Sequence, residues 1–105
     1  MNKNYINGRA FEYKVKNFFQ GLGAEVVRSA GSHGIDLMVI FYKEQGNLIW
    51  AVSCKKAKYH TLDERAKLVN LKENSKVDDV LICYPINGLI AMESVWKRYI
   101  LIWTS

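Results

Sequence analysis

The chain has 105 residues, half of them hydrophobic, which suits one domain with a small core, spanning residues 1–105, and leaves little room for a second. Charged residues make up 24%, proline occurs once and no segment is of low complexity, so the composition excludes an intrinsically disordered chain. The net charge of +5 is a moderate basic excess, which favours a polyanionic partner.

The sequence also argues against a secreted or membrane protein. No apolar stretch approaches the roughly 18 residues that span a membrane, and the N-terminus lacks an apolar signal core followed by a cleavage site. Cys54 and Cys83 lie in apolar, strand-like runs and show no zinc-ligand spacing with His33 or His60. We therefore expect a cytoplasmic protein with reduced, buried cysteines.

The first predicted element is an amphipathic helix. Asn7 is a suitable cap, and the apolar residues after it recur at spacings of four, three and four, which is typical of one helix face. These residues are Phe11, Val15, Phe18 and Leu22. The pair Gly21 and Gly23 predicts the end of the helix.

Three strands are predicted next, at residues 24–30, 35–43 and 48–56. The first is short and contains a β-branched pair, and residues 31–34, GSHG, form a turn signal. The second and third are strongly apolar and are joined by residues 45–47, QGN. Two apolar runs joined by a short Gly/Asn turn predict an antiparallel hairpin.

The second half predicts one helix and two further strands. Residues 61–64, TLDE, fit a capping box for a helix that ends near Asn74. Residues 80–84 predict a buried strand ended by Pro85. After it we expect a short irregular or helical piece near residues 92–97 and a last strand at residues 99–103. The order predicts an α/β domain whose mixed, largely antiparallel, five-stranded sheet is flanked by helices.

Several aromatic residues are expected to be mostly core. They are Phe18, Phe19, Tyr42, Trp50 and Trp103. Some of them are alternatively part of a dimer surface, because a second copy hides apolar area that a chain of this size cannot cover.

Asp36 and Lys55 are the residues of the predicted hairpin that suggest chemistry. Asp36 interrupts an apolar strand, where an unpaired carboxylate is costly to bury, and Lys55 lies at the end of the next strand. Such a pair can hold Mg²⁺ and a water against a phosphate, since the cation prefers oxygen ligands and the ammonium neutralises developing charge. The local alternatives are a turn-capping aspartate and a solvated lysine.

Three segments together resemble the archaeal-type Holliday junction resolvases of the PD-(D/E)xK nuclease superfamily. They are Glu12 in the first predicted helix, residues 26–36, VVRSAGSHGID, and residues 52–56, VSCKK. The run RSAGS followed four residues later by Asp36 is the most specific part, and the resemblance extends over about residues 8–56. It implies a restriction-endonuclease-like fold, in an archaeal or other prokaryotic cell or encoded by a virus.

The resemblance further implies a homodimeric endonuclease that uses Mg²⁺, or alternatively Mn²⁺, to cut two strands of a four-way DNA junction. Asp36, Glu12 and the backbone carbonyl of Cys54 would hold the metal, and Lys55 would orient the attacking water. The pair Arg28 and Ser32 would hold the scissile phosphate. Further residues expected to contact DNA are Arg9, Lys14, Lys16, His33, Lys56 and Lys58.

One position departs from the family, which has a glutamate where this chain has Ser53. A serine hydroxyl is a poor Mg²⁺ ligand, so metal binding at this catalytic position is in question. Three explanations stay open. Asp63 or Glu64 replaces the missing carboxylate, as in similar restriction endonucleases. Alternatively, Ser53 is a deliberate, inactivating replacement. In the third, the chain binds branched DNA without cutting it. A nuclease for duplex or flap substrates is a further alternative.

Overall fold

The computed structural model describes residues 3–29, 34–55, 62–95 and 100–104, with the backbone alone described for residues 3–8, 62–64 and 100–104. Two helices and six strands occur in these ranges. In chain order they are α1 (Lys3–Gly21), β1 (Glu25–Arg28), β2 (Leu37–Phe41), β3 (Leu48–Cys54), α2 (Leu62–Asn74), β4 (Asp79–Ile86), β5 (Leu89–Ser94) and β6 (Ile100–Thr104).

The described strands form one sheet whose spatial order is the same as the chain order. β3 and β4 are parallel, and the other neighbouring pairs are antiparallel. A parallel pair needs a long crossover, and α2 supplies it. The predicted α/β class with a mixed, largely antiparallel sheet is confirmed, with one strand more than expected.

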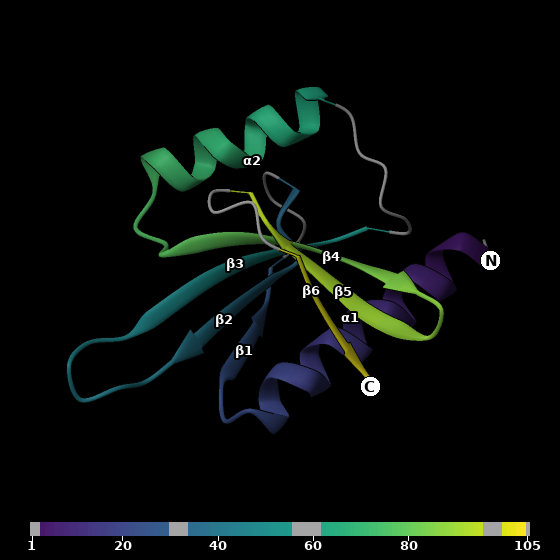
Figure 1. Ribbon diagram of the computed structural model, residues 1–105, viewed down its shortest axis with the longest axis horizontal. Helices are drawn as coiled ribbons and strands as arrows, with labels where there is room; N and C mark the ends of the chain where they lie inside the picture. The colour runs from purple at the N-terminus through teal and green to yellow at the C-terminus, as the bar shows by residue number, and fades with distance from the viewer. Residues whose placement is uncertain (1–2, 30–33, 56–61, 96–99, 105) are drawn as a thin grey trace.

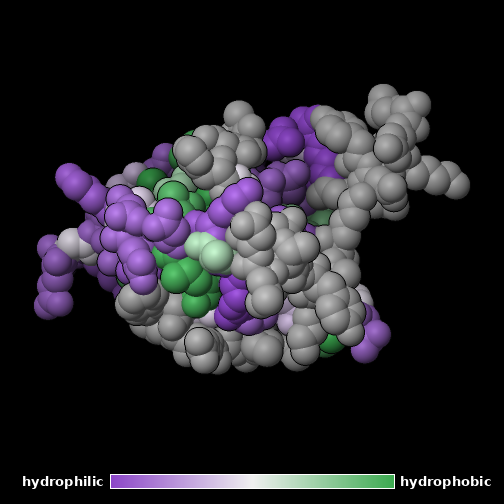
Figure 2. Space-filling view, turned by 90° about the horizontal axis from the view of Figure 1, so that it is seen from above, coloured by the Kyte–Doolittle hydropathy of each residue, from purple (hydrophilic) through white to green (hydrophobic). Residues whose placement is uncertain are grey.

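The helices cover opposite faces of the sheet (Figure 1). On the α1 face, Val15 and Phe19 are fully buried against a cluster that includes Leu37 and Val52. On the other face, Leu68 of α2 is buried in a second cluster. Figure 2 views the molecule from the α2 side, where hydrophilic residues gather. The core therefore has two layers, one under each helix.

The hairpin of β2 and β3 brings the predicted chemistry together. Its register places Leu37 opposite Val52 and Phe41 opposite Leu48, as the two apolar runs predicted. Asp36 directly precedes β2, so it lies beside the end of β3, which is Cys54. The hairpin was confirmed, and it is the element that positions the site.

The helix α1 begins earlier than the sequence predicted. It starts at Lys3, so Asn7 lies inside the helix and is not its cap. Leu22 is 55% exposed because α1 ends at Gly21 and the chain turns through Gly23, at φ 92°. Phe19, four residues after Val15, takes the expected place of Leu22 in the core.

The prediction for the chain just after Pro85 was wrong, whereas the last strand predicted at residues 99–103 is confirmed as β6. β4 continues through Pro85 to Ile86, and β5 occupies residues for which we expected an irregular or helical piece. Asn87 and Gly88 both have positive φ, 48° and 78°, and form a two-residue turn of the kind that joins hairpin strands. Pro85 is tolerated because it lies past Cys83, the last β4 residue in register with β3.

The aromatic residues divide between core and surface. Phe19 is buried, and Phe18 and Trp50 pack against the α1-side core. Tyr42 is 63% exposed, which corrects the expectation of a core position, because its hydroxyl donates to the Glu25 carboxylate at the surface. The side chain of Trp103 and the capping residue Thr61 lie outside the described residues. No helix in the described ranges is long and apolar enough to cross a membrane.

Candidate active site

Asp36 is fixed by both its backbone and its side chain. Its N–H donates to the carbonyl of Val52 at 2.9 Å, and its own carbonyl accepts the N–H of Ser29 at 2.8 Å. The carboxylate Oδ2 accepts the N–H of Cys54 at 2.7 Å. Asp36 is therefore held between the end of β1 and the end of β3.

The environment of Asp36 disfavours its charged form. Burial raises the pKa of this carboxyl above its ordinary value, although the hydrogen bond from Cys54 and the positive charges of Lys55 and Arg28 act in the opposite direction. Desolvation of a carboxylate is costly unless charge nearby compensates for it fully. A further cation beside Asp36 would therefore be stabilising.

Glu12 approaches the same place from α1. Burial raises the pKa of Glu12, and the negative charge of Asp36 raises it further, whereas Arg28 and Arg9 lower it. Arg28 Nη2 lies 3.8 Å from Glu12 Oε2, and 44% of the Arg28 side chain is exposed, so this ion pair is weak. The structure thus brings Glu12, Arg28 and Asp36 together, as their spacing suggested.

The end of β3 distributes its residues over two faces. Cys54 packs against the α1-side core, so the alternation of the strand places Ser53 on the α2 side. Lys55 follows β3, and its N–H donates to the carbonyl of Cys83 at 2.8 Å. The positive charge of Lys55 acts to lower the pKa of the Asp36 carboxyl.

Ser53 is fully buried, with 0% of its surface exposed. Its Oγ has no hydrogen-bond partner among the described residues, although a buried hydroxyl normally has one. The resemblance predicts a charged metal ligand at this position. The chain instead has a neutral hydroxyl that makes no hydrogen bond to any described residue.

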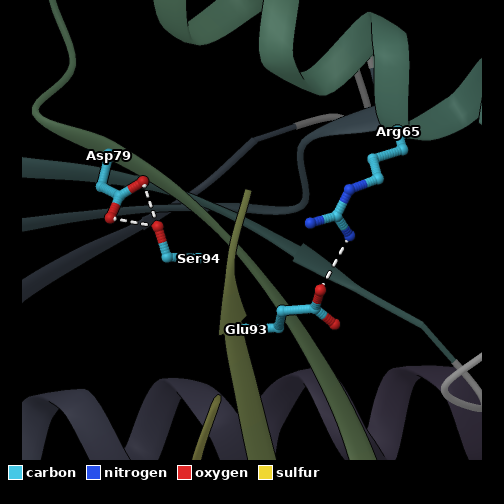
Figure 3. A network of polar contacts seen from close by, with 4 residues as sticks. All are labelled: Arg65, Asp79, Glu93 and Ser94. Atoms are coloured by element: carbon cyan, nitrogen blue, oxygen red, sulfur yellow. Dashed lines mark hydrogen bonds and ion pairs between the residues drawn. The ribbon is translucent and has the colours of Figure 1, made fainter. Parts of the chain in front are cut away.

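Two other described carboxylates, Glu93 and Asp79, are engaged by other partners. Glu93 lies on the same face as Ser53, two strands away, since Ser53 is in register with Ile82 and Ile82 with Glu93. Arg65 reaches from α2 to Glu93 at 2.8 Å and occupies its carboxylate (Figure 3). Asp79 accepts hydrogen bonds from the Ser94 hydroxyl in the same view and starts β4, at the other end of the sheet from Cys54.

The donor set suits a hard cation with few protein ligands. Asp36, Glu12 and the carbonyl of Cys54 are oxygen donors, which Mg²⁺ prefers, and the raised pKa values of both carboxyls fit a site that a cation would stabilise. Within the described ranges, no group of three or more His, Cys, Asp and Glu side chains converges. Asp36 and Glu12 therefore supply two oxygen donors of the kind that Mg²⁺ prefers, and the described side chains do not complete a metal site by themselves.

A groove of about 690 Å³ opens beside Lys55, on the α2 side of the sheet. Gly34 and Lys55 form one end, and α2 contributes Lys67, Asn70 and Asn74 at helical spacings of three and four. The amide of Asn74 donates to Asn70 Oδ1 at 2.7 Å, which orders that wall. Lys55 is therefore accessible from this side of the sheet.

The basic residues of α1 do not all point the same way. Lys14 Nζ donates to the carbonyl of Gly88 at 3.1 Å, so it reaches the turn between β4 and β5. Arg9 and Lys16 instead flank Tyr13, each with its cation 5.8 Å from the ring centroid. Arg9 donates a hydrogen bond to the Tyr13 hydroxyl, which lowers the pKa of Tyr13, and the positive charges of Arg9, Arg28 and Lys16 act in the same direction.

Our sequence reasoning missed Tyr13 as a candidate functional residue. The signal was present, because Arg9 and Lys16 lie four residues before and three after it, on one helix face. Tyr13 also directly follows Glu12.

The two cysteines are free neighbours in the register of β3 and β4. Burial raises the pKa of both thiols, so neither is an activated nucleophile. Cys83 is buried as expected, whereas Cys54 is partly exposed.

The remaining predicted residues lie outside what the structure describes and stay predictions. They are Ser32, His33, Lys56 and Lys58, together with the side chains of Asp63 and Glu64.

The fold is that of the restriction-endonuclease-like α/β class. The chain is similar in structure to Hjc, a Holliday junction resolvase of the archaeal hyperthermophile Archaeoglobus fulgidus, with a TM-score of 0.66 and 17% sequence identity. The match covers 92% of this chain and 81% of that one. No family model matches the chain, and no curated protein matches its sequence. At this identity the likeness concerns the fold.

Proposed function

We propose that this chain is a structure-selective DNA endonuclease that resolves four-way junctions by metal-dependent hydrolysis of a phosphodiester bond. The main observation in support of this function is the half-buried Asp36 carboxylate, which accepts a hydrogen bond from the Cys54 N–H and is surrounded by charged groups. Glu12 supplies a second carboxylate there, and Arg28 and Lys55 supply cations. The fold shared with a Holliday junction resolvase supports the choice of a branched substrate.

The metal in this proposal is Mg²⁺, or Mn²⁺ in its place. Asp36 and Glu12 would hold it, because each is a carboxylate of raised pKa and Asp36 contributes to the rise at Glu12. The carbonyl of Cys54 would add a third oxygen. When bound, such an ion lowers the pKa of a coordinated water and stabilises charge on the leaving oxygen.

The positively charged side chains of the site would bind the phosphate and orient the nucleophile. Lys55 would orient the attacking water and neutralise developing charge, since its ammonium already acts on Asp36. Arg28 would bind the scissile phosphate, because its contact with Glu12 is long and nearly half of its side chain is exposed. Ser32 is proposed for the same phosphate.

A homodimer working on cytoplasmic DNA would place two such sites on one junction. Val27 lies in β1, an edge strand of the sheet, and is 47% exposed, and Leu22, shortly before this strand, is 55% exposed. Exposed apolar residues at a sheet edge offer a surface that a second copy can cover.

A specific observation favours a second candidate, a branched-DNA-binding module without nuclease activity. Ser53 is neutral, fully buried and without a described hydrogen-bond partner at the position where a metal-binding carboxylate is expected. Losing one carboxylate from a small Mg²⁺ site weakens binding of the ion.

The test is cleavage of a labelled four-way junction with and without Mg²⁺, beside a linear duplex of equal length. The proteins are the chain itself, Asp36→Ala, Ser53→Glu and the control Glu44→Ala, an exposed carboxylate in the turn between β2 and β3. We expect the chain and Glu44→Ala to cut the junction, and Asp36→Ala to lose at least a hundredfold in rate.

Each other outcome selects another explanation. If only Ser53→Glu cuts the junction, the fold is that of a resolvase whose activity is lost through the single residue Ser53. If no variant cuts but all bind the junction, the binding module is the correct function. Equal cleavage of junction and duplex would contradict structure selectivity.

A further inference from the structure

Tyr13 is an exposed aromatic residue at the edge of the candidate active site. It is 45% exposed, whereas Val15 and Phe19 of the same helix are fully buried. It directly follows Glu12, and no hydrophobic cluster of the described core includes it. Packing in the core therefore does not explain this tyrosine.

Two cations hold the Tyr13 ring in place. Arg9 Cζ and Lys16 Nζ each lie over the ring at 5.8 Å from its centroid, within the range of a cation–π interaction. The hydroxyl adds a second kind of contact, because Arg9 donates to its oxygen and the hydroxyl keeps its own proton to donate.

A shallow hollow links Tyr13 to the site around Asp36. The hollow is lined by Arg9, Glu12, Tyr13, Lys16, Arg28 and Leu37. It brings three cations together with one carboxylate, and that carboxylate, Glu12, is near Asp36. The side chains around it carry a net positive charge, which favours an anion at its mouth, and one of them is Arg28, the residue proposed for the scissile phosphate.

We propose that the Tyr13 hydroxyl, with Arg9 and Lys16, binds a second phosphate of the strand that is cut, next to the scissile one. The proposal rests on the proposed function for the identity of its ligand, a DNA backbone. Phosphate oxygens accept O–H and guanidinium donors, and such contacts fix the register of a protein on DNA. Tyr13 is therefore a positioning residue, which sets which phosphate reaches Asp36.

The test measures junction binding in EDTA, where no cleavage occurs, by fluorescence anisotropy. Tyr13→Phe removes the hydroxyl and keeps the ring that contacts the two cations. The matched control is Tyr42→Phe, a tyrosine that is 63% exposed and whose hydroxyl bonds to Glu25. We expect Tyr13→Phe to weaken binding about tenfold, as for a hydrogen bond to a charged group, and Tyr42→Phe to bind as the parent does.

Neutral methylphosphonates placed one at a time along the strand locate the contact. One position should weaken binding by the parent chain about tenfold and have no further effect on Tyr13→Phe, because the lost contact is then the same. In Mg²⁺, Tyr13→Phe should also cut at shifted positions. If Tyr13→Phe binds as tightly as the parent, or every methylphosphonate weakens both proteins equally, the proposal is wrong.

Failure of the proposed function would look different. A parent chain that binds the junction without cutting it, with Tyr13→Phe weakened, overturns the nuclease and supports the phosphate site. A chain that cuts, with Tyr13→Phe unchanged in affinity and in cleavage position, overturns only the phosphate site. No binding of any DNA would overturn both.

Discussion

The Asp36 carboxylate combines a good hydrogen bond with an unfavourable charge. Cys54 N–H holds it at 2.7 Å, yet burial keeps its pKa above the ordinary value of 3.8. Folding without a bound cation must therefore proceed against this charge at neutral pH. A carboxylate that lowers the stability of its own fold is typical of a functional site.

Asp36→Asn should raise the free energy of unfolding at pH 7 in EDTA. The amide oxygen can still accept the Cys54 N–H, and the buried charge is gone. Since the folded pKa is raised, the parent is penalised as pH increases from 3.8 through that raised value, and the penalty is complete above it. The advantage of Asp36→Asn should vanish below pH 3.8. Urea unfolding followed by circular dichroism across this range measures it.

Asp78→Asn is the matched control for this prediction. Asp78 is exposed and also accepts a backbone N–H, from Ile49 at 2.7 Å. We expect no gain in stability from it. Millimolar Mg²⁺ should then raise the thermal midpoint of the parent and leave Asp36→Asn unchanged, because a ligand stabilises the state that binds it. An equal shift in both proteins would place the metal elsewhere.

A functional residue could be predicted from the sequence where a charged side chain stood among apolar neighbours. Asp36 in an apolar run pointed to a site, and the structure places Glu12, Arg28 and Lys55 around it. The orientation of Ser53 was not recognised, because it depends on which strand face turns toward which helix.

At the scale of elements, α2 is held to the sheet by apolar packing and by one ion pair. Leu68 is buried in the core of that face with Val69 and Leu71 packed against it, and Arg65 reaches Glu93 on β5 (Figure 3). The side chains of this pair are only 25% and 15% exposed. Because α2 forms one wall of the groove beside Lys55, this ion pair helps to set the width of that groove.

Glu93→Gln should loosen α2 without unfolding the sheet. It leaves Arg65 with a weaker partner, at a cost of about 1 kcal/mol for a partly buried ion pair. The amides of α2 should exchange with solvent about fivefold faster, while those of β3 and β4 stay protected. Hydrogen exchange measures this, with Glu73→Gln on the exposed side of α2 as control. Unchanged exchange in Glu93→Gln would show that the apolar packing of α2, through Leu68, Val69 and Leu71, is enough to hold the helix.

Helices and strands with a regular pattern of apolar residues were predicted well from the sequence. A strand whose bounds depend on pairing with a neighbouring strand was not. The apolar runs of β2 and β3 and the stripe of α1 follow local patterns. β5 was missed because Pro85 suggested a strand end, although the Asn87–Gly88 pair that follows it is a strong hairpin signal. A proline at a position without a β3 partner is harmless, and that fact appears only in the sheet.

For the whole molecule, the basic excess should govern the binding of DNA. Affinity for the junction should fall with salt, with a slope of log K against log[salt] near −0.9 for each phosphate contacted. We expect Arg9→Gln combined with Lys16→Gln to make this slope shallower by about one unit, and Lys43→Gln, in the distant turn between β2 and β3, to leave it unchanged. Anisotropy titrations between about 50 and 200 mM salt measure this slope. A slope near zero would contradict every DNA-binding function.

The strands lie in the sheet in the same order as in the chain, and this arrangement affects the rate of folding. Apart from β3 and β4, the paired strands are separated by only a few residues of chain, so those contacts close quickly. The parallel pair of β3 and β4 instead waits for the whole α2 crossover to form. We therefore expect the folding transition state to be limited by this one closure, with the hairpin that carries Asp36 already in place ahead of it.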